Sequence, residues 1–546
     1  MRRDDAAPAS ERWLALAAVS AVALVWFCGL ELRSLVSPDE GRYADIAREM
    51  LDSGDWITPR LNGLKYFEKP PLQYWATAAA FALFGADEWT ARLWPALTGF
   101  LGIVVTALAA ARLAPAVPAT LTVLMFAGCW GYFVGAQFLT LDMGLTFFLT
   151  GAMLAFLLSR APGAPPAAER GWMLVAWAAM ALAVLSKGLV GVVLPALVLA
   201  VYVAIERDWA LLRRLHWVPG LAVFVAIAAP WFVLVQRHNP EFLWFFFVHE
   251  HFERYLLPYH HRPGPWWYFA PVLLIGLLPW TPRLPGAVAR GWAAPAAGGM
   301  RIDRFLIVWA AVVTVFFSVS ESKLPGYVLP AFPALLLLIA RNAPLRDRSV
   351  ATSFAAGCAL FVFAAAVPWL RGSAVPAGMP PGYSAWLLGA GFVLCTAALA
   401  ALKLRRAGAV AAVALGSLLA LQLALSGTHL LNEDLSSEGL IDLVVGEKKA
   451  FLRSPPFYSV ATFDHSVPFY LGRPVTMVAD KNELGPGIAS EPAKYVPSVD
   501  EFVARWNRDV EAFAIMSPAL YDKLRGQGLP GRVVVRDAHR VLIARR

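Results

Sequence analysis

Long apolar runs separated by short polar loops dominate the chain up to about position 428. Runs of about 20 apolar residues can cross a lipid bilayer as helices, which satisfy their own backbone hydrogen bonds there. The first run is longer than the apolar part of a signal peptide and no small-residue cleavage site follows it, so we expect it to remain as an anchor. The pattern predicts about thirteen spans, near 13–32, 90–111, 117–138, 143–159, 171–186, 188–205, 217–236, 268–282, 303–318, 324–340, 350–370, 384–402 and 408–427.

A charged segment, 34–88, interrupts this pattern between the first two predicted spans. At its start, Ser37 is predicted to cap a helix, Pro38 to be the first helical residue and Glu40 to complete a capping box. Asp39 is then the spare carboxylate at this helix start. Further on, 72–84 is apolar but too short to span, so we expect it to lie in the membrane interface or to re-enter.

Asp39 falls on the apolar stripe of the predicted helix when the residues are placed at helical spacing. This position has two interpretations: a functional acid, or a carboxylate that the helix dipole favours near an N-terminus. The stripe consists of Asp39, Tyr43, Ile46 and Met50, and the other face carries Arg42, Asp45 and Glu49.

The basic residues of the loops predict the orientation of the spans. With the N-terminus in the cytoplasm, every second loop is cytoplasmic, and those loops carry arginine or lysine one after another, as the positive-inside rule requires. The ionisable residues of interest then gather on the opposite, external side. The external segments are 34–88, the turn at Asp142, Lys187, 237–267, 318–326, 371–383 and the tail from about 428.

The tail has a different composition from the rest of the chain. Short β-like runs at 457–463, 475–479, 532–536 and 541–544 alternate with helical patterns near 498–508 and 517–526. We therefore predict two domains: a transmembrane domain over 1–428, whose 34–88 loop carries interfacial helices, and a small α/β domain over 429–546.

Composition narrows the class of protein. A mean hydropathy of +0.57 excludes a soluble enzyme, and no glycine-rich phosphate motif is present, which argues against nucleotide hydrolysis. The four cysteines lie in or beside apolar runs and match no disulfide framework or zinc spacing. The net charge of +9 comes from residues in loops, so we predict no nucleic-acid partner and room for anionic membrane lipids.

Several ionisable residues fall at the external ends of predicted spans, where burial in a membrane is costly and suggests function. Asp142 opens one span and Lys187 closes another, while Lys323 lies in S320-E-S-K-L-P-G-Y. Asp142 is alternatively a helix N-terminal acid, and the lysines can simply extend to the interface.

Lys69 is held by the two prolines that follow it, which fix the backbone at this point. A fixed lysine with Arg42 and Arg254 near it suits a phosphate. Alternatively, Lys69 is an interfacial cation that only extends to the membrane surface. A second cluster, H249-E-H-F-E-R, could bind zinc through His249 with Glu68 as partner, although its spacing matches no standard closed zinc site.

These segments resemble a known family. S37-P-D-E-G-R-Y, Y66-F-E-K-P-P-L-Q-Y-W, T140-L-D-M-G, L185-S-K-G, W267-Y-F-A-P-V-L-L-I-G-L-L-P-W and E321-S-K-L-P-G-Y-V-L-P are similar to the bacterial lipid A aminoarabinose transferases. These are polytopic GT-C glycosyltransferases of the inner membrane and are related to protein O-mannosyltransferases. The tail carries little that is diagnostic of the family.

The resemblance implies transfer of 4-amino-4-deoxy-L-arabinose from undecaprenyl phosphate to a lipid A phosphate, which gives resistance to polymyxin-type peptides. It implies a site on the periplasmic side of the inner membrane, with Asp39 and Asp142 as its acids and Lys69 as a donor-phosphate ligand. We expect a monomer with no obligatory cofactor and with membrane lipids as partners. The predicted substrate-binding residues are Arg42, Tyr43, Lys69, Lys187, Arg254, Lys323 and Tyr327.

The acceptor decides what Asp39 does. A protein hydroxyl is a weak nucleophile and needs a general base, whereas a phosphate monoester is largely anionic at neutral pH and gives Asp39 little proton to remove. Alternatives are another polyprenyl-phosphate sugar, as in a protein O-mannosyltransferase, or a lipid transporter. A transporter would place paired charges at the bilayer midplane in repeated halves, and no such repeat is visible. The sequence leaves open which lipid A phosphate is modified.

Overall fold

The computed structural model describes residues 9–113, 118–253, 264–296, 300–342, 348–366, 381–431, 435–448 and 455–545. The chain forms two compact units, each built from three segments. The first unit comprises Met1–Leu30, Glu68–Gln73 and Arg92–Gly427, and the second comprises Glu31–Phe67, Tyr74–Ala91 and Thr428–Arg546. This division differs from the predicted domains, which remain a prediction, because the 34–88 loop belongs largely to the second unit.

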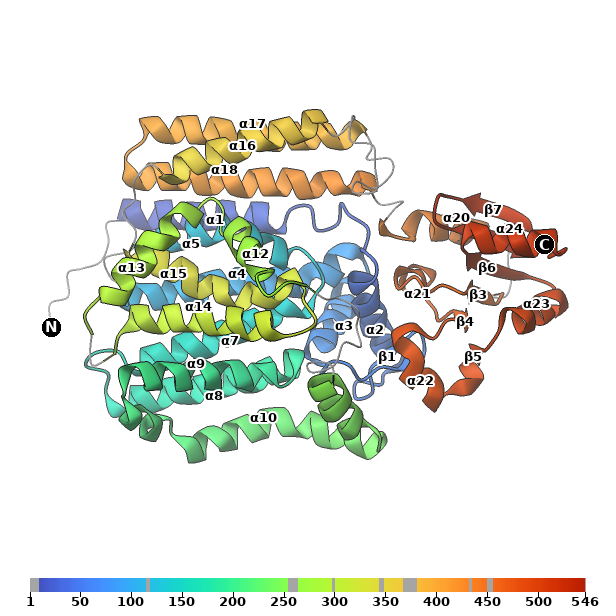
Figure 1. Cartoon of the computed structure of the whole chain (residues 1–546), viewed down its shortest axis with the longest axis horizontal. Helices are drawn as coiled ribbons and strands as arrows, with labels where there is room; N and C mark the ends of the chain where they lie inside the picture. The colour runs from blue at the N-terminus through green and yellow to red at the C-terminus, as the bar shows by residue number, and fades with distance from the viewer. Residues whose placement is uncertain are drawn as a thin grey trace. The chain divides into compact units, whose positions relative to one another are not determined.

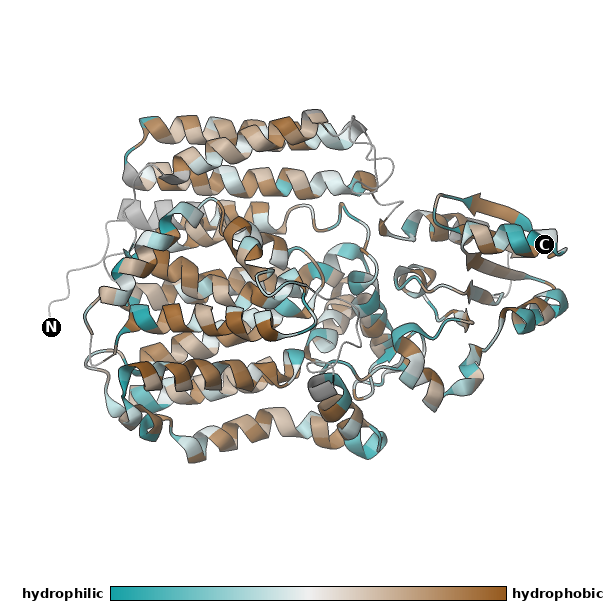
Figure 2. Cartoon of the chain, in the orientation of Figure 1, coloured by the Kyte–Doolittle hydropathy of each residue, from teal (hydrophilic) through white to brown (hydrophobic). Residues whose placement is uncertain are grey.

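The first unit is helical, and Figure 2 shows that its long helices are predominantly apolar. Most of these helices run along a common direction (Figure 1). They are α1 (Ala9–Phe27), α4 (Glu88–Leu113, which starts in the second unit), α5 (Ala119–Ala127), α6 (Trp130–Ala136), α7 (Leu141–Ser159), α8 (Pro166–Lys187), α9 (Val190–Glu206), α10 (Trp217–His238), α12 (Phe269–Gly276), α13 (Leu284–Ala293), α14 (Ile302–Val319), α15 (Phe332–Asn342), α16 (Arg348–Ala366), α17 (Pro381–Lys403) and α18 (Arg406–Ser426).

Among the described residues, seven helices are long and apolar enough to cross a membrane, and two bent pairs raise this number to as many as nine. The chain is therefore a polytopic α-helical protein, while the predicted count of about thirteen spans remains a prediction. The helix α7 is the most deeply enclosed of the seven, since 83% of its apolar window is buried.

Some predicted spans are not single straight helices. The run at 117–138 forms α5 and α6, which meet at an angle of 72°. The break contains Gly128, where an added Cβ would lie 2.7 Å from the carbonyl oxygen of Ala414. The run at 324–340 begins as a 3₁₀ segment, η4 (Pro325–Ala331), before α15. Proline at 325 and 330 explains this, because proline lacks the N–H that a regular helix needs.

The second unit contains a six-stranded sheet with the order β5–β4–β3–β6–β8–β7. The strands β3 to β6 are parallel neighbours, and β8 is antiparallel to both β6 and β7. Its elements are α20 (Glu438–Lys448), β3 (Phe457–Val460), α21 (Ser466–Leu471), β4 (Thr476–Val478), α22 (Gly485–Ser490), β5 (Tyr495–Val496), α23 (Val499–Arg508), β6 (Ala512–Met516), α24 (Pro518–Gly526), β7 (Arg532–Arg536) and β8 (Val541–Arg545).

These elements confirm the predicted α/β character of the tail. The helices at 498–508 and 517–526 are present, and each is capped by a serine whose side chain accepts a backbone N–H, Ser498 from Glu501 and Ser517 from Leu520. The central strand β6 is buried along its whole length and was not among the predicted strands. Its sequence, A512-F-A-I-M, is a short continuous apolar run, which periodicity alone cannot assign.

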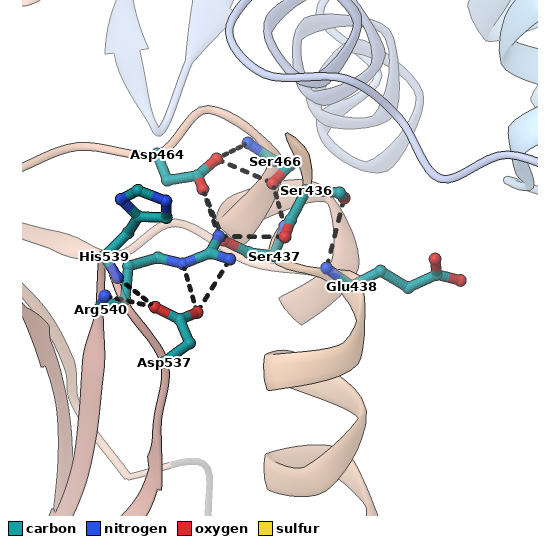
Figure 3. A network of polar contacts seen from close by, with 8 residues as sticks. All are labelled: Ser436, Ser437, Glu438, Asp464, Ser466, Asp537, His539 and Arg540. Atoms are coloured by element: carbon teal, nitrogen blue, oxygen red, sulfur yellow. Dashed lines mark hydrogen bonds and ion pairs between the residues drawn. The ribbon is translucent and has the colours of Figure 1, made fainter. Parts of the chain in front are cut away.

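A polar network ties three parts of the second unit together (Figure 3). Asp464 accepts hydrogen bonds from the Ser437 hydroxyl at 2.6 Å and from the Ser466 backbone at 2.9 Å. The Arg540 guanidinium bridges Asp464 and Asp537, each at 3.1 Å. The network therefore joins the start of α20, the start of α21 and the β7–β8 hairpin.

The second unit also contains α2 (Asp39–Ser53), the hairpin strands β1 (Arg60–Leu61) and β2 (Leu64–Lys65), and most of α3 (Leu72–Phe84). The predicted capping box is wrong, because Pro38 occupies the N-cap and makes no side-chain cap hydrogen bond. The Ser37 side chain is instead hydrogen-bonded to Asp464. The Glu40 carboxylate does reach back, but it accepts from the Val36 N–H at 2.9 Å.

Both faces of α2 are buried, which corrects the expected division into an apolar stripe and a polar face. Arg42, Asp45 and Glu49 are as enclosed as Tyr43 and Ile46. Hydrogen-bond and ion-pair partners within the second unit compensate for this burial, since buried charges need such partners.

The helix α2 and the β1–β2 turn are joined by hydrogen bonds. Asp45 accepts from the Asn62 N–H at 2.9 Å and Glu49 from the Gly63 N–H at 2.6 Å. Both turn residues have positive φ, 52° and 74°, the geometry for which an Asn-Gly pair is preferred. The turn therefore presents its backbone N–H groups to the acids of α2.

Candidate active site

In the first unit, Asp142 and Lys187 form an ion pair between the start of α7 and the end of α8. Their side chains are 12% and 14% exposed, so the pair is largely enclosed. The ammonium of Lys187 also lies 4.6 Å from the ring centroid of Tyr327, within the range of a cation–π contact. Three residues predicted from separate sequence motifs therefore meet in one cluster.

The segment η4 reaches this cluster through two successive residues. A Cβ added to Gly326 would lie 2.7 Å from Oδ2 of Asp142, which is closer than real contacts allow. Glycine at this position therefore lets the η4 backbone approach the carboxylate and places the neighbouring Tyr327 ring against Lys187. The requirement is one of space, since Gly326 is not among the glycines with positive φ.

Lys69 is engaged by a carboxylate of its own unit. Its ammonium lies 3.0 Å from Oε2 of Glu250 and donates to the Glu68 carbonyl at 2.8 Å. The Glu250 side chain is only 2% exposed, while that of Lys69 is 15% exposed. A phosphate that binds Lys69 would therefore compete with the buried carboxylate of Glu250 for the ammonium.

Glu250 comes from a π-helical segment, η2 (Trp244–Glu253), that precedes the predicted phosphate ligand Arg254. Arg254 lies outside the described residues. Lys323 is buried, and its ammonium donates to the Ser320 carbonyl at 2.6 Å.

The predicted zinc ligands, Glu68 and His249, remain a prediction. Glu68 is buried, and the His249 ring is half-buried with its centroid 5.2 Å from that of Phe245. Within the described part of the chain, no group of three His, Cys, Asp or Glu side chains is arranged to hold a metal ion. The side chains of His251 and Glu253 lie outside that part.

In the second unit, Asp39 is held by Arg42. The Asp39 Oδ1 accepts from the Arg42 Nη1 at 2.7 Å, and its side chain is 38% exposed. The same guanidinium forms a bidentate pair with Glu483, through Nε at 2.6 Å and Nη2 at 2.8 Å. Arg42 therefore binds two carboxylates through three of its five N–H donors, and the phosphate contact predicted for it stays a prediction.

Glu483 is the hub of this second group. His465 Nε2 lies 2.9 Å from Glu483 Oε1, the same oxygen that accepts from Arg42 Nε. Burial alone raises the pKa of Glu483, but the His465 hydrogen bond and the Arg42 charge outweigh it and lower this pKa to about 2. Glu483 is thus a permanent anion at neutral pH that fixes Arg42 and, through it, the orientation of Asp39.

Tyr43 packs beside this group. It is buried, its ring centroid lies 6.1 Å from that of Tyr74, and the Arg42 guanidinium lies 5.7 Å from it. The predicted role of Tyr43 in substrate binding stays a prediction. Sequence reasoning missed Glu250, Glu483 and His465 as partners, because 181 residues separate Lys69 from Glu250 and 441 separate Arg42 from Glu483.

Two comparisons define the class of protein. Residues 12–246 match the family described as dolichyl-phosphate-mannose-protein mannosyltransferase. The fold is also shared with the crystal structure of the Archaeoglobus fulgidus oligosaccharyltransferase, with a TM-score of 0.51 at 13% identity over 93% of this chain and 70% of that one. The chain is thus a polytopic membrane protein with the fold of the GT-C glycosyltransferases.

More similar proteins identify the family. The crystal structure of ArnT from Cupriavidus metallidurans bound to undecaprenyl phosphate is 39% identical, with a TM-score of 0.92 over 98% of this chain and 99% of that one. Residues 447–545 match the aminoarabinose transferase C-terminal domain. The chain belongs to the ArnT family of aminoarabinose transferases.

A curated relative from Edwardsiella ictaluri, named undecaprenyl phosphate-alpha-4-amino-4-deoxy-L-arabinose arabinosyl transferase, is 34% identical over 331 residues. The match covers 60% of this chain and 58% of that protein, so the chain spans less than two thirds of this relative's length.

Proposed function

We propose that this protein transfers 4-amino-4-deoxy-L-arabinose from undecaprenyl phosphate to a phosphate of lipid A. The observation that carries the proposal is the 39% identity, over almost the whole of both chains, to an ArnT whose structure holds undecaprenyl phosphate. The name of the Edwardsiella ictaluri relative supplies the sugar. The acceptor follows from the family resemblance of the motifs and from the chemistry described below.

The proposed reaction needs little help with proton transfer. An oxygen of the acceptor phosphate forms a bond to the anomeric carbon, and the bond from that carbon to the donor phosphate breaks. The bonding electrons leave with undecaprenyl phosphate, whose charge increases. Preorganised cations can stabilise that charge. We assign Lys69 to it, together with Arg254 and, less directly, Lys323.

Asp142, Lys187 and Tyr327 are assigned to the sugar and its phosphate. The Lys187 ammonium can turn from Asp142 toward an incoming phosphate, and the Asp142 carboxylate can then accept from the amino group of the sugar. This exchange of partners keeps both buried charges compensated, which a dry site requires. Gly326 permits it by leaving the Asp142 carboxylate uncovered by a side chain.

Asp39 is proposed as an orienting group. A phosphate acceptor is already largely anionic at neutral pH and offers no proton that a base must remove. The ion pair with Arg42, itself held by Glu483, keeps the Asp39 carboxylate in one orientation. Arg42 is therefore assigned a positioning role, and its contact with a substrate phosphate is not required.

We further propose a monomer in the bacterial inner membrane, with both groups of residues on the periplasmic side. The observation that supports the orientation is the alternation of arginine-containing loops along the chain, which follows the positive-inside rule. No cofactor is needed for the proposed transfer. A zinc ion at Glu68 and His249 would be structural or would assist the donor phosphate.

The test is mass spectrometry of lipid A from a polymyxin-sensitive host that lacks its own transferase and expresses this chain. We expect a mass increase of one aminoarabinose unit, and no increase with the Asp39→Asn variant at equal expression. A mass increase of another sugar would assign a different donor. Modification of a secreted protein with unchanged lipid A would overturn the proposed acceptor and favour an O-mannosyltransferase-like activity.

A further inference from the structure

A second cluster of charged residues lies at the ends of α7 and α8 opposite to Asp142 and Lys187. Arg160 follows the last residue of α7, and its Nη2 lies 2.7 Å from Glu169 Oε1 at the start of α8. Arg214 donates to the same carboxylate, from Nη2 to Oε2 at 2.5 Å and from Nε to Oε1 at 3.1 Å. The proposed transfer uses none of these residues.

Arg160 has an unused donor in this cluster. The residue is only 7% exposed, and its Nη1 is buried without a hydrogen-bond partner. Burial, together with the neighbouring Arg214 charge, lowers the pKa of Arg160. Leaving such a donor unsatisfied costs about 1–3 kcal/mol, and more when the group is charged. An additional anionic oxygen would remove this cost.

The charges of the two connections at this end are predominantly positive. The segments 160–170 and 207–214 together contain five arginines and two carboxylates, Glu169 and Asp208. Arg214 is the accessible member of the cluster, with a side chain that is 55% exposed. A guanidinium pair of this kind suits a phosphate, which it can bind through two parallel hydrogen bonds.

An apolar cavity of about 160 Å³ opens among α7, α8 and α9 beside the cluster. Phe156, Met173 and Leu215 are among its walls. Arg160 lies four residues after Phe156 in sequence, Glu169 four before Met173, and Arg214 directly before Leu215. Each of these charged residues is therefore within one helical turn, or one residue, of a residue that lines the cavity. A dry cavity of about 150 Å³ can hold a benzene molecule, so this one has room for part of an acyl chain.

Two tryptophans mark this end as a membrane interface. Trp209 and Trp217 are 64% and 49% exposed, and exposed tryptophans of membrane proteins gather at the level of the lipid headgroups. Trp217 also lines the cavity and packs edge-on against Trp177, with ring centroids 5.5 Å apart. A free phosphate would use only the arginines, whereas a lipid would use the arginines, the tryptophans and the cavity.

We propose that this end of the first unit binds one anionic phospholipid of the surrounding bilayer. Its phosphate contacts Arg160 and Arg214, and part of one acyl chain enters the cavity beside Trp177 and Trp217. The site is distinct from the residues assigned to the sugar donor, and its occupant is not a substrate.

The experiment is native mass spectrometry of the full-length protein titrated with phosphatidylglycerol or with phosphatidylcholine of the same acyl chains. We expect phosphatidylglycerol to bind at least about tenfold more tightly. Arg214→Gln should reduce this preference to about twofold or less, and Arg160→Gln should do the same. Arg170→Gln is the matched control. Arg170 is exposed and lies in α8 directly after Glu169.

A third variant tests the cavity separately from the charges. Ala196 lines the cavity and is exposed, so Ala196→Leu can fill the space with little risk to folding. This variant should weaken the binding of both lipids about equally and leave the ratio of the two affinities unchanged. Equal binding of the two lipids by the unaltered protein, or an unchanged preference in Arg214→Gln with normal thermal unfolding, would overturn the proposal. If inorganic phosphate competes as well as the lipid, the site binds a free anion and the proposal is also overturned.

Discussion

Three of the cations that the sequence assigns to substrate binding are bound to carboxylates in the structure. Lys69 is paired with Glu250, Lys187 with Asp142, and Arg42 with Asp39 and Glu483. Such pairs lower the cost of burying a cation but also compete with an incoming phosphate. We therefore expect substrate affinity to depend on the carboxylates as much as on the cations.

Glu250→Gln tests this competition at Lys69. The variant keeps the shape of the side chain but leaves the buried ammonium without a counter-charge, so we expect undecaprenyl phosphate to bind about threefold to tenfold more tightly. Lys69→Ala should weaken the same binding. Direct lipid-binding measurements on the purified full-length protein give both values. Asp87→Asn, which removes an exposed carboxylate, is the control, and weaker binding in Glu250→Gln would contradict the competition.

Glu49 makes the stability of the second unit depend on pH. Burial, followed by the charge of Asp45, raises the pKa of Glu49 from 4.5 to about 8. The folded state therefore holds a proton that the unfolded state has lost, so the stabilisation is complete below pH 4.5 and is lost as the pH rises to about 8. We expect the free energy of unfolding to fall by up to about 1.4 kcal/mol per pH unit within this window.

Hydrogen exchange of the β6 amides in the full-length protein measures this dependence. Glu49→Gln should flatten the slope, because the amide cannot ionise and can still accept the hydrogen bond from Gly63. Glu501→Gln, on the half-exposed surface of α23, should leave the slope as it is in the unaltered protein. A slope that survives in Glu49→Gln would assign the pH dependence to other groups.

At the scale of elements, the contact between α2 and α21 sets the position of Asp39. Gly41 faces the α21 backbone so closely that an added Cβ would lie 2.6 Å from the Ser466 nitrogen and 2.7 Å from the His465 carbonyl carbon. The obstacle is backbone on both sides, which cannot move aside as a flexible side chain can. The helix that carries Asp39 therefore rests directly on the start of α21.

Gly41→Ala should separate these two elements. We expect a loss of about 1–3 kcal/mol of stability, as for other overpacked contacts, together with a fall in transfer rate larger than the change in donor affinity. Hydrogen exchange of the second unit and a reconstituted transfer assay measure the two effects. Gly439→Ala is a matched control in α20, because a Cβ there meets nothing within 4 Å. Equal effects of the two substitutions would contradict a positioning role for this contact.

Elements with a strong periodic signal could be predicted from the sequence, while their interruptions could not. The long apolar helices, α23 and α24 follow directly from residue spacing and capping residues. The break between α5 and α6 depends on how closely Gly128 approaches α18, and the cap of α2 depends on a hydrogen bond between Ser37 and Asp464. Both depend on partners several hundred residues away, which local spacing does not show.

The candidate site was predicted as a set of residues without their partners. Asp142, Lys187 and Tyr327 do meet, because helix ends and the η4 segment bring separate motifs together. The carboxylates Glu250 and Glu483 were not assigned to the site as partners of Lys69 and Arg42, since neither partnership follows from sequence spacing. Burial of all sides of α2 was missed for the same reason.

At the scale of the whole molecule, the proposed transfer gives cations of the chain the role that a metal ion has in many phosphate-transferring enzymes. Lysine and arginine residues at the predicted external ends of the spans can offset the charge that would develop on the donor phosphate. We therefore expect transfer activity to persist in excess chelator. Elemental analysis of the purified protein is the accompanying measurement, and stoichiometric zinc with loss of activity in chelator would instead establish a metal site at Glu68 and His249.

The composition of the second unit from three separate stretches of chain limits how this protein can be divided or recombined. The Arg42–Glu483 pair and the mutual hydrogen bonds between Asn62 and Val475 hold its early and late stretches together. A fragment that begins near residue 429 would expose these surfaces and lose their counter-charges. Chimeras between relatives should therefore exchange 31–67 and 74–91 together with the tail, so that both members of each ion pair come from the same relative.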